Sequence, residues 1–171
     1  MIYENYIHTK KLNLDLNITK NSCEKLYALI KENFSKNKID YTGQSTLSTG
    51  LFSSYNLLLY PLDQFHELYL EIQKMLNEIK DENDNHKYYI QCWFNYYKKG
   101  DYIDWHRHWD HADCWHGFYC VDVEPSYTSY KLPHRTDIVD IQSRNNLLVL
   151  ARGNDDIHRS SQWDHQDRDR I

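Results

Sequence analysis

The sequence has no run of apolar residues long enough to span a bilayer, and its basic residues form no cluster. The N-terminal segment, MIYENYIHTKKLNLDL, lacks the uninterrupted apolar region of a signal peptide. The net charge is −5, and no basic patch with interleaved aromatic residues is present to follow a phosphate backbone. These absences predict a soluble, cytoplasmic protein that binds neither membranes nor nucleic acid.

Cysteine pairs of the Cys-x-x-Cys type are also missing, which argues against a structural zinc site. The four cysteines are predicted to be reduced thiols; they are Cys23, Cys92, Cys114 and Cys120. No internal repeat and no low-complexity linker divides the chain. Its 171 residues suffice for one domain with a proper core but not for two, so we expect a single domain over residues 1–171.

Two segments in the first half of the chain have the apolar spacing of amphipathic helices. The first is predicted over 22–34, after a capping-box-like start at Asn21, and the second runs from Pro61 to about Lys80. Alternation up to residue 18 predicts a half-buried strand before the first helix. The polar segment 36–54 is predicted to be a loop.

From residue 88 onward the pattern changes to short strands separated by turns. Seven are predicted, over 88–97, 102–109, 115–123, 126–131, 137–141, 146–151 and 157–161. Short strands at this spacing favour an antiparallel sandwich or barrel. Together with the two helices, they predict a mainly β fold of the double-stranded β-helix type (jelly roll, cupin-like), with helical support over 1–87 and the β-helix core over 88–171.

Residues 92–123 concentrate side chains that can build a site, with four of the ten histidines and four of the five tryptophans. If the segment after Gly100 is a strand, His106, His108 and Asp110 lie on one face and can approach one metal ion. His158 follows about fifty residues later. This spacing is typical of a ferrous site of two histidines and one carboxylate.

A series of spaced residues runs through this half of the chain: Tyr97, Gly100, His106, His108, His158 and an arginine just before Ile171. The series resembles the Fe(II)- and 2-oxoglutarate-dependent oxygenases, most closely prolyl-4-hydroxylase-like members and small oxygenases encoded by marine phages. The likeness covers roughly residues 90 to 171, with a weaker echo at Gly43-Gln44-Ser45-Thr46-Leu47.

The resemblance implies bound Fe(II) and 2-oxoglutarate, with Tyr97 near the cosubstrate. An arginine fork binds a carboxylate through two parallel hydrogen bonds, and either Arg168 or Arg170 can therefore hold the distal carboxylate of 2-oxoglutarate. The family usually continues from this arginine into a further hydrophobic strand, whereas the sequence stops at Ile171. We expect either a shortened chain or a barrel that closes differently.

The metal ligands have two alternative assignments. The family's strand carries His-x-Asp, but counting from Tyr97 and Gly100 gives His106-x-His108 and a three-histidine set. A shift of two residues gives His108-x-Asp110 and restores the carboxylate. His108 and His158 belong to both assignments.

Several further residues are candidates for the surroundings of this site. His111 and His116 are candidates for orienting the ligating histidines through hydrogen bonds. Weaker candidates are Tyr119 and Tyr127 near the cosubstrate, Trp105, Trp109, Trp115 and Trp163 as pocket walls, and Asp155 and Asp156 at the rim.

The predicted function is that of an Fe(II)- and 2-oxoglutarate-dependent dioxygenase. Such an enzyme uses O2 to hydroxylate a small-molecule or peptidyl substrate and releases succinate and CO2. If the likeness extends to the phage proteins, the cytoplasm is that of a phage-infected bacterium. The alternative is a cupin-like metal or small-ligand binding protein without oxygenase activity.

Overall fold

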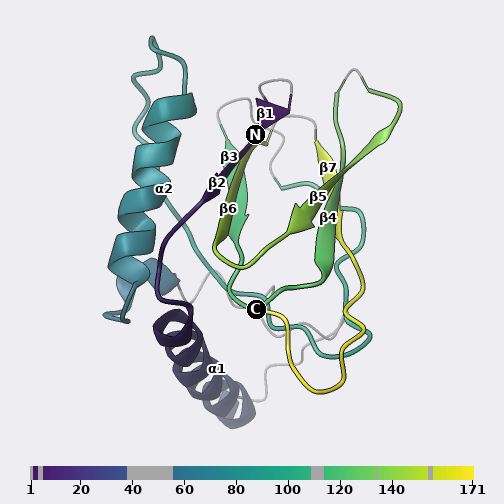
Figure 1. Ribbon diagram of the computed structural model, residues 1–171. Helices are drawn as coiled ribbons and strands as arrows, with labels where there is room; N and C mark the ends of the chain where they lie inside the picture. Colours follow the sequence, from purple (N-terminus) through teal and green to yellow (C-terminus); the bar gives the residue numbers. More distant parts are fainter. Residues whose placement is uncertain (1, 4–5, 38–55, 109–113, 134, 154–155) are drawn as a thin grey trace.

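The computed structural model describes residues 2–3, 6–37, 56–108, 114–133, 135–153 and 156–171 (Figure 1). Within these ranges the chain is mainly β, with two long helices. In chain order the elements are β1 (Ile2–Tyr3), β2 (Ile7–Lys11), α1 (Leu16–Asn37), the 3-10 helix η1 (Leu57–Leu59), α2 (Phe65–Ile79), β3 (Trp115–Tyr119), β4 (Ser126–Lys131), β5 (Ile138–Ser143), β6 (Leu147–Arg152) and β7 (Ile157–Ser160). None of the described helices combines the length and apolarity needed to cross a membrane.

The strands form two antiparallel sheets, ordered β1-β2-β6-β3 and β5-β4-β7. A shared apolar core joins them: Ile7 and Val149 of the first sheet cluster with Tyr130 and Ile141 of the second. β2 pairs with β6, so the first part of the chain also contributes a strand to the sheet.

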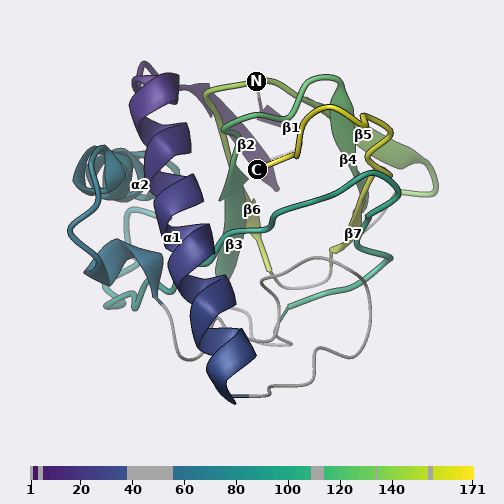
Figure 2. The ribbon, with the colours of Figure 1, turned by 90° about the horizontal axis from the view of Figure 1, so that it is seen from below.

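Both helices lie on the side of the four-stranded sheet that faces away from β4, β5 and β7 (Figures 1 and 2). Successive residues of a strand point to opposite faces. In β6, Val149 therefore faces the core between the sheets, whereas Leu148 and Leu150 pack with Leu68 and Met75 of α2. The four-stranded sheet is thus covered by apolar side chains on both faces.

The chain between β2 and α1 differs from the prediction. The half-buried strand was expected to continue to residue 18 and the helix to begin near residue 22, but β2 ends at Lys11 and α1 begins at Leu16. Asp15 explains the early start, because its carboxylate accepts hydrogen bonds from the backbone N–H groups of Asn17 and Ile18. This is the action of a helix cap.

The second helix begins later than predicted, at Phe65 rather than near Pro61. Gln64, immediately before it, has a positive φ of 68°, a left-handed conformation that lies outside the helix. The expected end near Lys80 is confirmed, since α2 ends at Ile79.

The predicted strands over 88–97 and 102–109 do not form as continuous strands in the described residues. Isolated bridges join Tyr97 to Arg170 and His106 to His158 instead. Between the two bridges, the N–H of Ser160 donates to the carbonyl of Ile103. We call this arrangement the ribbon: residues 97–106 run antiparallel to residues 158–170. The turn at Gly100, where φ is +91°, interrupts its regular pairing.

The five strands predicted after residue 114 are confirmed within a few residues, although β3 ends at Tyr119 rather than at residue 123. Beyond β3, the N–H of Val121 donates to the carbonyl of Ile171, and the N–H of Ile171 donates to Asp122. Ile171 itself is buried. The last residue of the sequence therefore lies beside the continuation of β3.

Candidate metal centre

His106, His108 and His158 meet at one end of the ribbon. The backbones of His106 and His158 form two mutual hydrogen bonds, of 3.0 and 2.9 Å, and side chains of directly opposed residues in such a pair lie on the same face. The three side chains offer ring nitrogens that all lie within 4.8 Å of one another. The predicted convergence of these three histidines is therefore present in the fold.

A second group shares His158. It consists of His116 from β3, Asp156 and His158, whose ligand atoms also lie within 4.8 Å of one another. The Asp156 carboxylate lies 2.8 Å from Nε2 of His116 and 3.5 Å from Nδ1 of His158. The rings of His116 and His158 are stacked, with centroids 4.5 Å apart and planes 6° from parallel. His116 and Asp156 thus hold one side of the His158 ring.

The histidine pKa values favour the ligand form. Burial, together with the neighbouring imidazoles, lowers the pKa of His108 to about 3 and that of His158 to about 4. Both rings are therefore neutral at pH 7. Neutral imidazole is the form of histidine that binds a metal ion.

Asp156 carries a buried negative charge. Its side chain is only 3% exposed, and burial opposes ionisation, but the contacts with His116 and His158 hold the pKa of the carboxyl below its usual range. Nδ1 of His158 is buried and lacks a hydrogen bond of good geometry, because the distance to Asp156 is 3.5 Å. Three clustered imidazoles beside a buried carboxylate form a donor set that fits a divalent transition metal such as Fe(II).

Tyr97 and Arg170 lie at the other end of the ribbon and are both 5% exposed. Their backbones are paired, and the Arg170 guanidinium lies 4.7 Å from the centroid of the Tyr97 ring. Arg170 also donates to the carbonyl of Ser161 at 3.2 Å. Ser160, which is on the same face of β7 as His158, hydrogen-bonds to Tyr97. A buried polar surface thus connects the histidines with Arg170.

Arg168 is placed differently from Arg170. Its side chain is 41% exposed, lies 3.5 Å from the Asp122 carboxylate and donates to the carbonyl of Glu124. Of the two arginines that the sequence left as alternatives, Arg170 is buried in the ribbon, whereas Arg168 lies at the surface.

Other sequence candidates have different positions. Trp105 lies against the side chains of Lys131 and Arg159, and buried Trp163 donates from its ring nitrogen to the carbonyl of Arg168. Tyr119 donates to the side chain of Asn146, and Tyr127 is exposed. Candidates outside the described residues are Gly43 to Leu47 with most of loop 36–54, Trp109, Asp110, His111 and Asp155.

Sequence reasoning missed two aromatic neighbours of the cluster. Tyr130 is fully buried with its ring centroid 5.4 Å from that of His158, and Trp93 meets His108 edge-on at 6.1 Å. The sequence-based prediction also placed Asp156 only at the rim of the pocket. The spacing Asp156-x-His158 was a usable signal, because residues two apart in an extended segment share a face.

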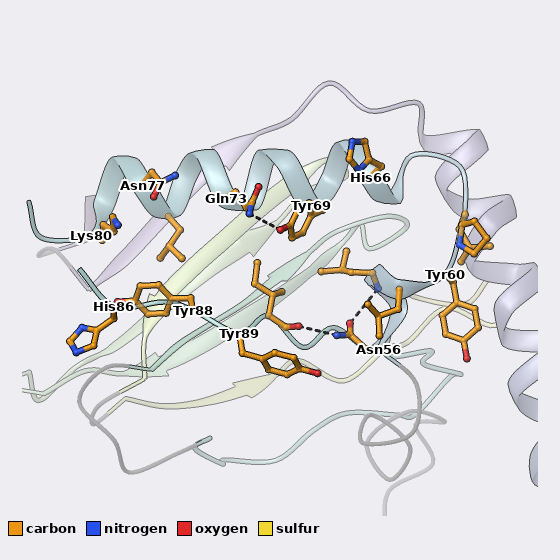
Figure 3. A pocket seen from close by; sticks show the side chains of 16 residues that line it. Asn56, Tyr60, His66, Tyr69, Gln73, Asn77, Lys80, His86, Tyr88 and Tyr89 are labelled. Carbon is orange, nitrogen blue, oxygen red and sulfur yellow. Dashed lines mark hydrogen bonds between the residues drawn. The ribbon is translucent and has the colours of Figure 1, made fainter. Parts of the chain in front are cut away.

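One cavity of the described residues lies away from the histidines. Its volume is about 730 Å³, and it lies between α2, η1 and the segment 86–90 (Figure 3). In Figure 3, Tyr69 and Gln73 of α2 face Tyr88 and Tyr89 across it. None of the clustered histidines lines this cavity. Its size therefore does not identify it as the place of the chemistry.

The fold and the cluster together define a mainly β protein with antiparallel sheets, two helices and a candidate metal site. The crystal structure of a Pseudomonas putida prolyl-4-hydroxylase is similar to this chain, with a TM-score of 0.53 over 96% of this chain and 87% of that one. The two sequences are 11% identical, so the likeness establishes a shared fold. No protein-family model and no curated protein sequence matches the chain.

Proposed function

We propose that the chain is an Fe(II)- and 2-oxoglutarate-dependent dioxygenase that hydroxylates a small-molecule or peptidyl substrate. The observation that carries the proposal is the ribbon, which has a cluster of neutral histidines at one end and a buried arginine at the other. The fold shared with a prolyl-4-hydroxylase supports it.

His106, His108 and His158 would hold the iron. The convergence of their ring nitrogens supports this assignment over the one that uses Asp110. His108 and His158 are neutral at pH 7, so they need not lose a proton before binding a cation. Because His158 is buried, water has little access to that side of the ion.

Tyr97, Ser160 and Arg170 would bind 2-oxoglutarate. Ser160 follows His158 by two residues, a separation of about 7 Å along a strand. The guanidinium of Arg170 would pair with the distal carboxylate, and its contact with the Tyr97 ring fixes its position. When bound, iron and 2-oxoglutarate would supply the redox chemistry, with O2 as the oxidant and succinate and CO2 as the products of 2-oxoglutarate oxidation. The residues of the chain orient the cosubstrate and exclude water.

The proposal includes a double-stranded β-helix. The segment at His106 pairs beside β7, and the segment at Ile171 pairs beside the continuation of β3. These pairings extend the three-stranded sheet at one end of the ribbon and the four-stranded sheet at the other. The distribution of successive segments between two facing sheets is the jelly-roll pattern.

The proposal is tested by anaerobic titration of the purified protein with Fe(II) and then with 2-oxoglutarate. We expect a weak visible absorption band when both are present. Arg170→Ala should weaken 2-oxoglutarate binding by at least about tenfold, since a charge-assisted pair is lost. Arg168→Ala is the matched control and should leave the affinity for 2-oxoglutarate unchanged, because Arg168 lies at the surface. Iron binding without any 2-oxoglutarate response would contradict the proposal.

A cupin-like metal-binding protein without oxygenase activity is the second candidate. One observation favours it: the group of His106, His108 and His158 contains no carboxylate. In that case, the protein would bind divalent metals, and 2-oxoglutarate would have no effect on their affinity.

A further inference from the structure

The three proposed iron ligands carry no charge of their own. Histidine binds a metal ion as neutral imidazole, so a divalent cation among the three rings would keep two positive charges in a partly buried place. Burying an uncompensated charge is costly. In the His-x-Asp pattern that the sequence resembles, a carboxylate at position 108 would provide compensation, but this chain has His108 there.

Asp156 is the acidic side chain that contacts the cluster within the described residues. Its carboxylate lies 2.8 Å from Nε2 of His116 and 3.5 Å from Nδ1 of His158, and its side chain is 3% exposed. Tyr130 forms a wall beside both rings and is fully buried. Because this surrounding has a low dielectric, the charge of Asp156 acts strongly on its neighbours.

We propose that Asp156 supplies the negative charge that the His106-x-His108 motif lacks, and that it does so through His158. This inference rests on the proposed function. With Nδ1 of His158 facing Asp156, Nε2 is the ring nitrogen left for the ion. A carboxylate on the far nitrogen of a ligating histidine fixes the ring orientation and makes the ligand more basic.

His116 completes this arrangement. Its ring is stacked on that of His158 and its Nε2 contacts the same carboxylate, so Asp156 is held between two imidazoles. His116 belongs to β3 and His158 to β7, and the two sheets therefore meet at this carboxylate. Asp156 is a positioning residue, acting on the ion through His158.

The test uses Asp156→Asn, which keeps the shape of the side chain and removes its charge. Anaerobic calorimetric titration with Fe(II), and with Co(II) as a spectroscopic probe, should show about 10–100-fold weaker binding than in the unaltered protein. Asp122→Asn is the matched control, because Asp122 is a part-buried, ion-paired carboxylate whose partner Lys20 lies 2.7 Å away. The Asp122→Asn variant should bind both Fe(II) and Co(II) with unchanged affinity.

A second substitution separates charge supply from a structural role. His108→Asp, added to Asp156→Asn, returns a carboxylate to the His-x-Asp position and should restore most of the lost affinity. If Asp156 only ties β3 to β7, the double variant will stay as weak as Asp156→Asn, and the inference is overturned. An unchanged affinity in Asp156→Asn alone would also overturn it. If the unaltered protein binds neither metal, the proposed function itself fails, and this inference fails with it.

Discussion

The two sheets differ in what they turn toward the middle of the molecule. The four-stranded sheet presents Ile7, Val149 and Ala151, and helix α2 covers its other face with leucines and methionine. The three-stranded sheet alternates differently: His158 and Ser160 of β7 are buried polar residues, although apolar Ile141 of β5 joins the same core. The four-stranded sheet is thus built mainly for packing and contributes His116 of β3 to the cluster, whereas the three-stranded sheet combines packing with polar chemistry.

Replacing His158 with Ala tests this division most severely. The histidine belongs to both candidate ligand groups, so we expect metal affinity to fall by more than about 100-fold, beyond the loss typical of a supporting residue. The metal-free protein should still unfold cooperatively. His86→Ala, at an exposed histidine outside the cluster, serves as the control in the same titration. If His158→Ala binds metal with unchanged affinity, the three-stranded sheet does not contribute to a metal site.

Leu148→Ala probes the packing sheet. Leu148 is 1% exposed between β6 and α2, so truncation should lower the free energy of unfolding by about 3 kcal/mol. The metal affinity of the folded fraction should not change. Leu59→Ala, at a leucine that is 78% exposed, should stay within about 0.5 kcal/mol in the same denaturant titration. A large loss of metal affinity in Leu148→Ala would show that the two sheets are not separable in this way.

The clustered histidines should also make the stability of the metal-free protein depend on pH. The folded pKa values of His108 and His158, about 3 and about 4, lie below their ordinary value of 6.5, so the unfolded chain binds protons that the folded chain does not. The free energy of unfolding should therefore be flat above pH 6.5 and fall as the pH is lowered toward 4, by at most about 1.4 kcal/mol per pH unit for each ring. Denaturant titrations at several pH values measure this slope. His158→Asn should reduce it, and an unchanged slope would contradict the pKa assignment.

Trp105 offers the smallest test, on the outer side of the three-stranded sheet. Its ring lies 4.2 Å from the Lys131 ammonium and 4.6 Å from the Arg159 guanidinium. Trp105→Leu should cost about 1 kcal/mol of unfolding free energy, since each exposed cation–π contact contributes about 0.5–1 kcal/mol. Metal affinity should be unaffected. A marked loss of metal affinity would place Trp105 in the wall of the site, as the sequence first indicated.

Local patterns predicted much of the fold. The observed strands from residue 115 onward agree within a few residues with those predicted from alternation. Both helices lie where apolar residues recur at helical spacing. The ribbon could not be predicted in detail, because His106 and Tyr97 pair with residues far along the chain, and a turn at Gly100 lies between them. The early start of α1 depends on Asp15, whose capping role is hidden within an alternating leucine pattern.

Local patterns also predicted part of the candidate site, namely the grouping of its three histidines. Alternation places His106 and His108 together, and spacing indicates His158 as their partner. The contact of Asp156 with His116 depends on how β3 faces β7, which no local pattern specifies. The choice between Arg168 and Arg170 depends on which of them is buried in the ribbon. Metal binding by these residues stays a prediction until it is measured.

The pairing of residues 97–106 with residues 158–170 also determines when the cluster can form during synthesis. His106 and His108 leave the ribosome about fifty residues before His158 does. At a translation rate of about 5–20 residues per second, they wait for their partner for roughly 3–10 seconds. During that interval a metal ion would find two histidines on an unpaired segment, without Asp156 or the stacked rings. The complete ligand set therefore arises late, after β2, β3 and both helices have been synthesised.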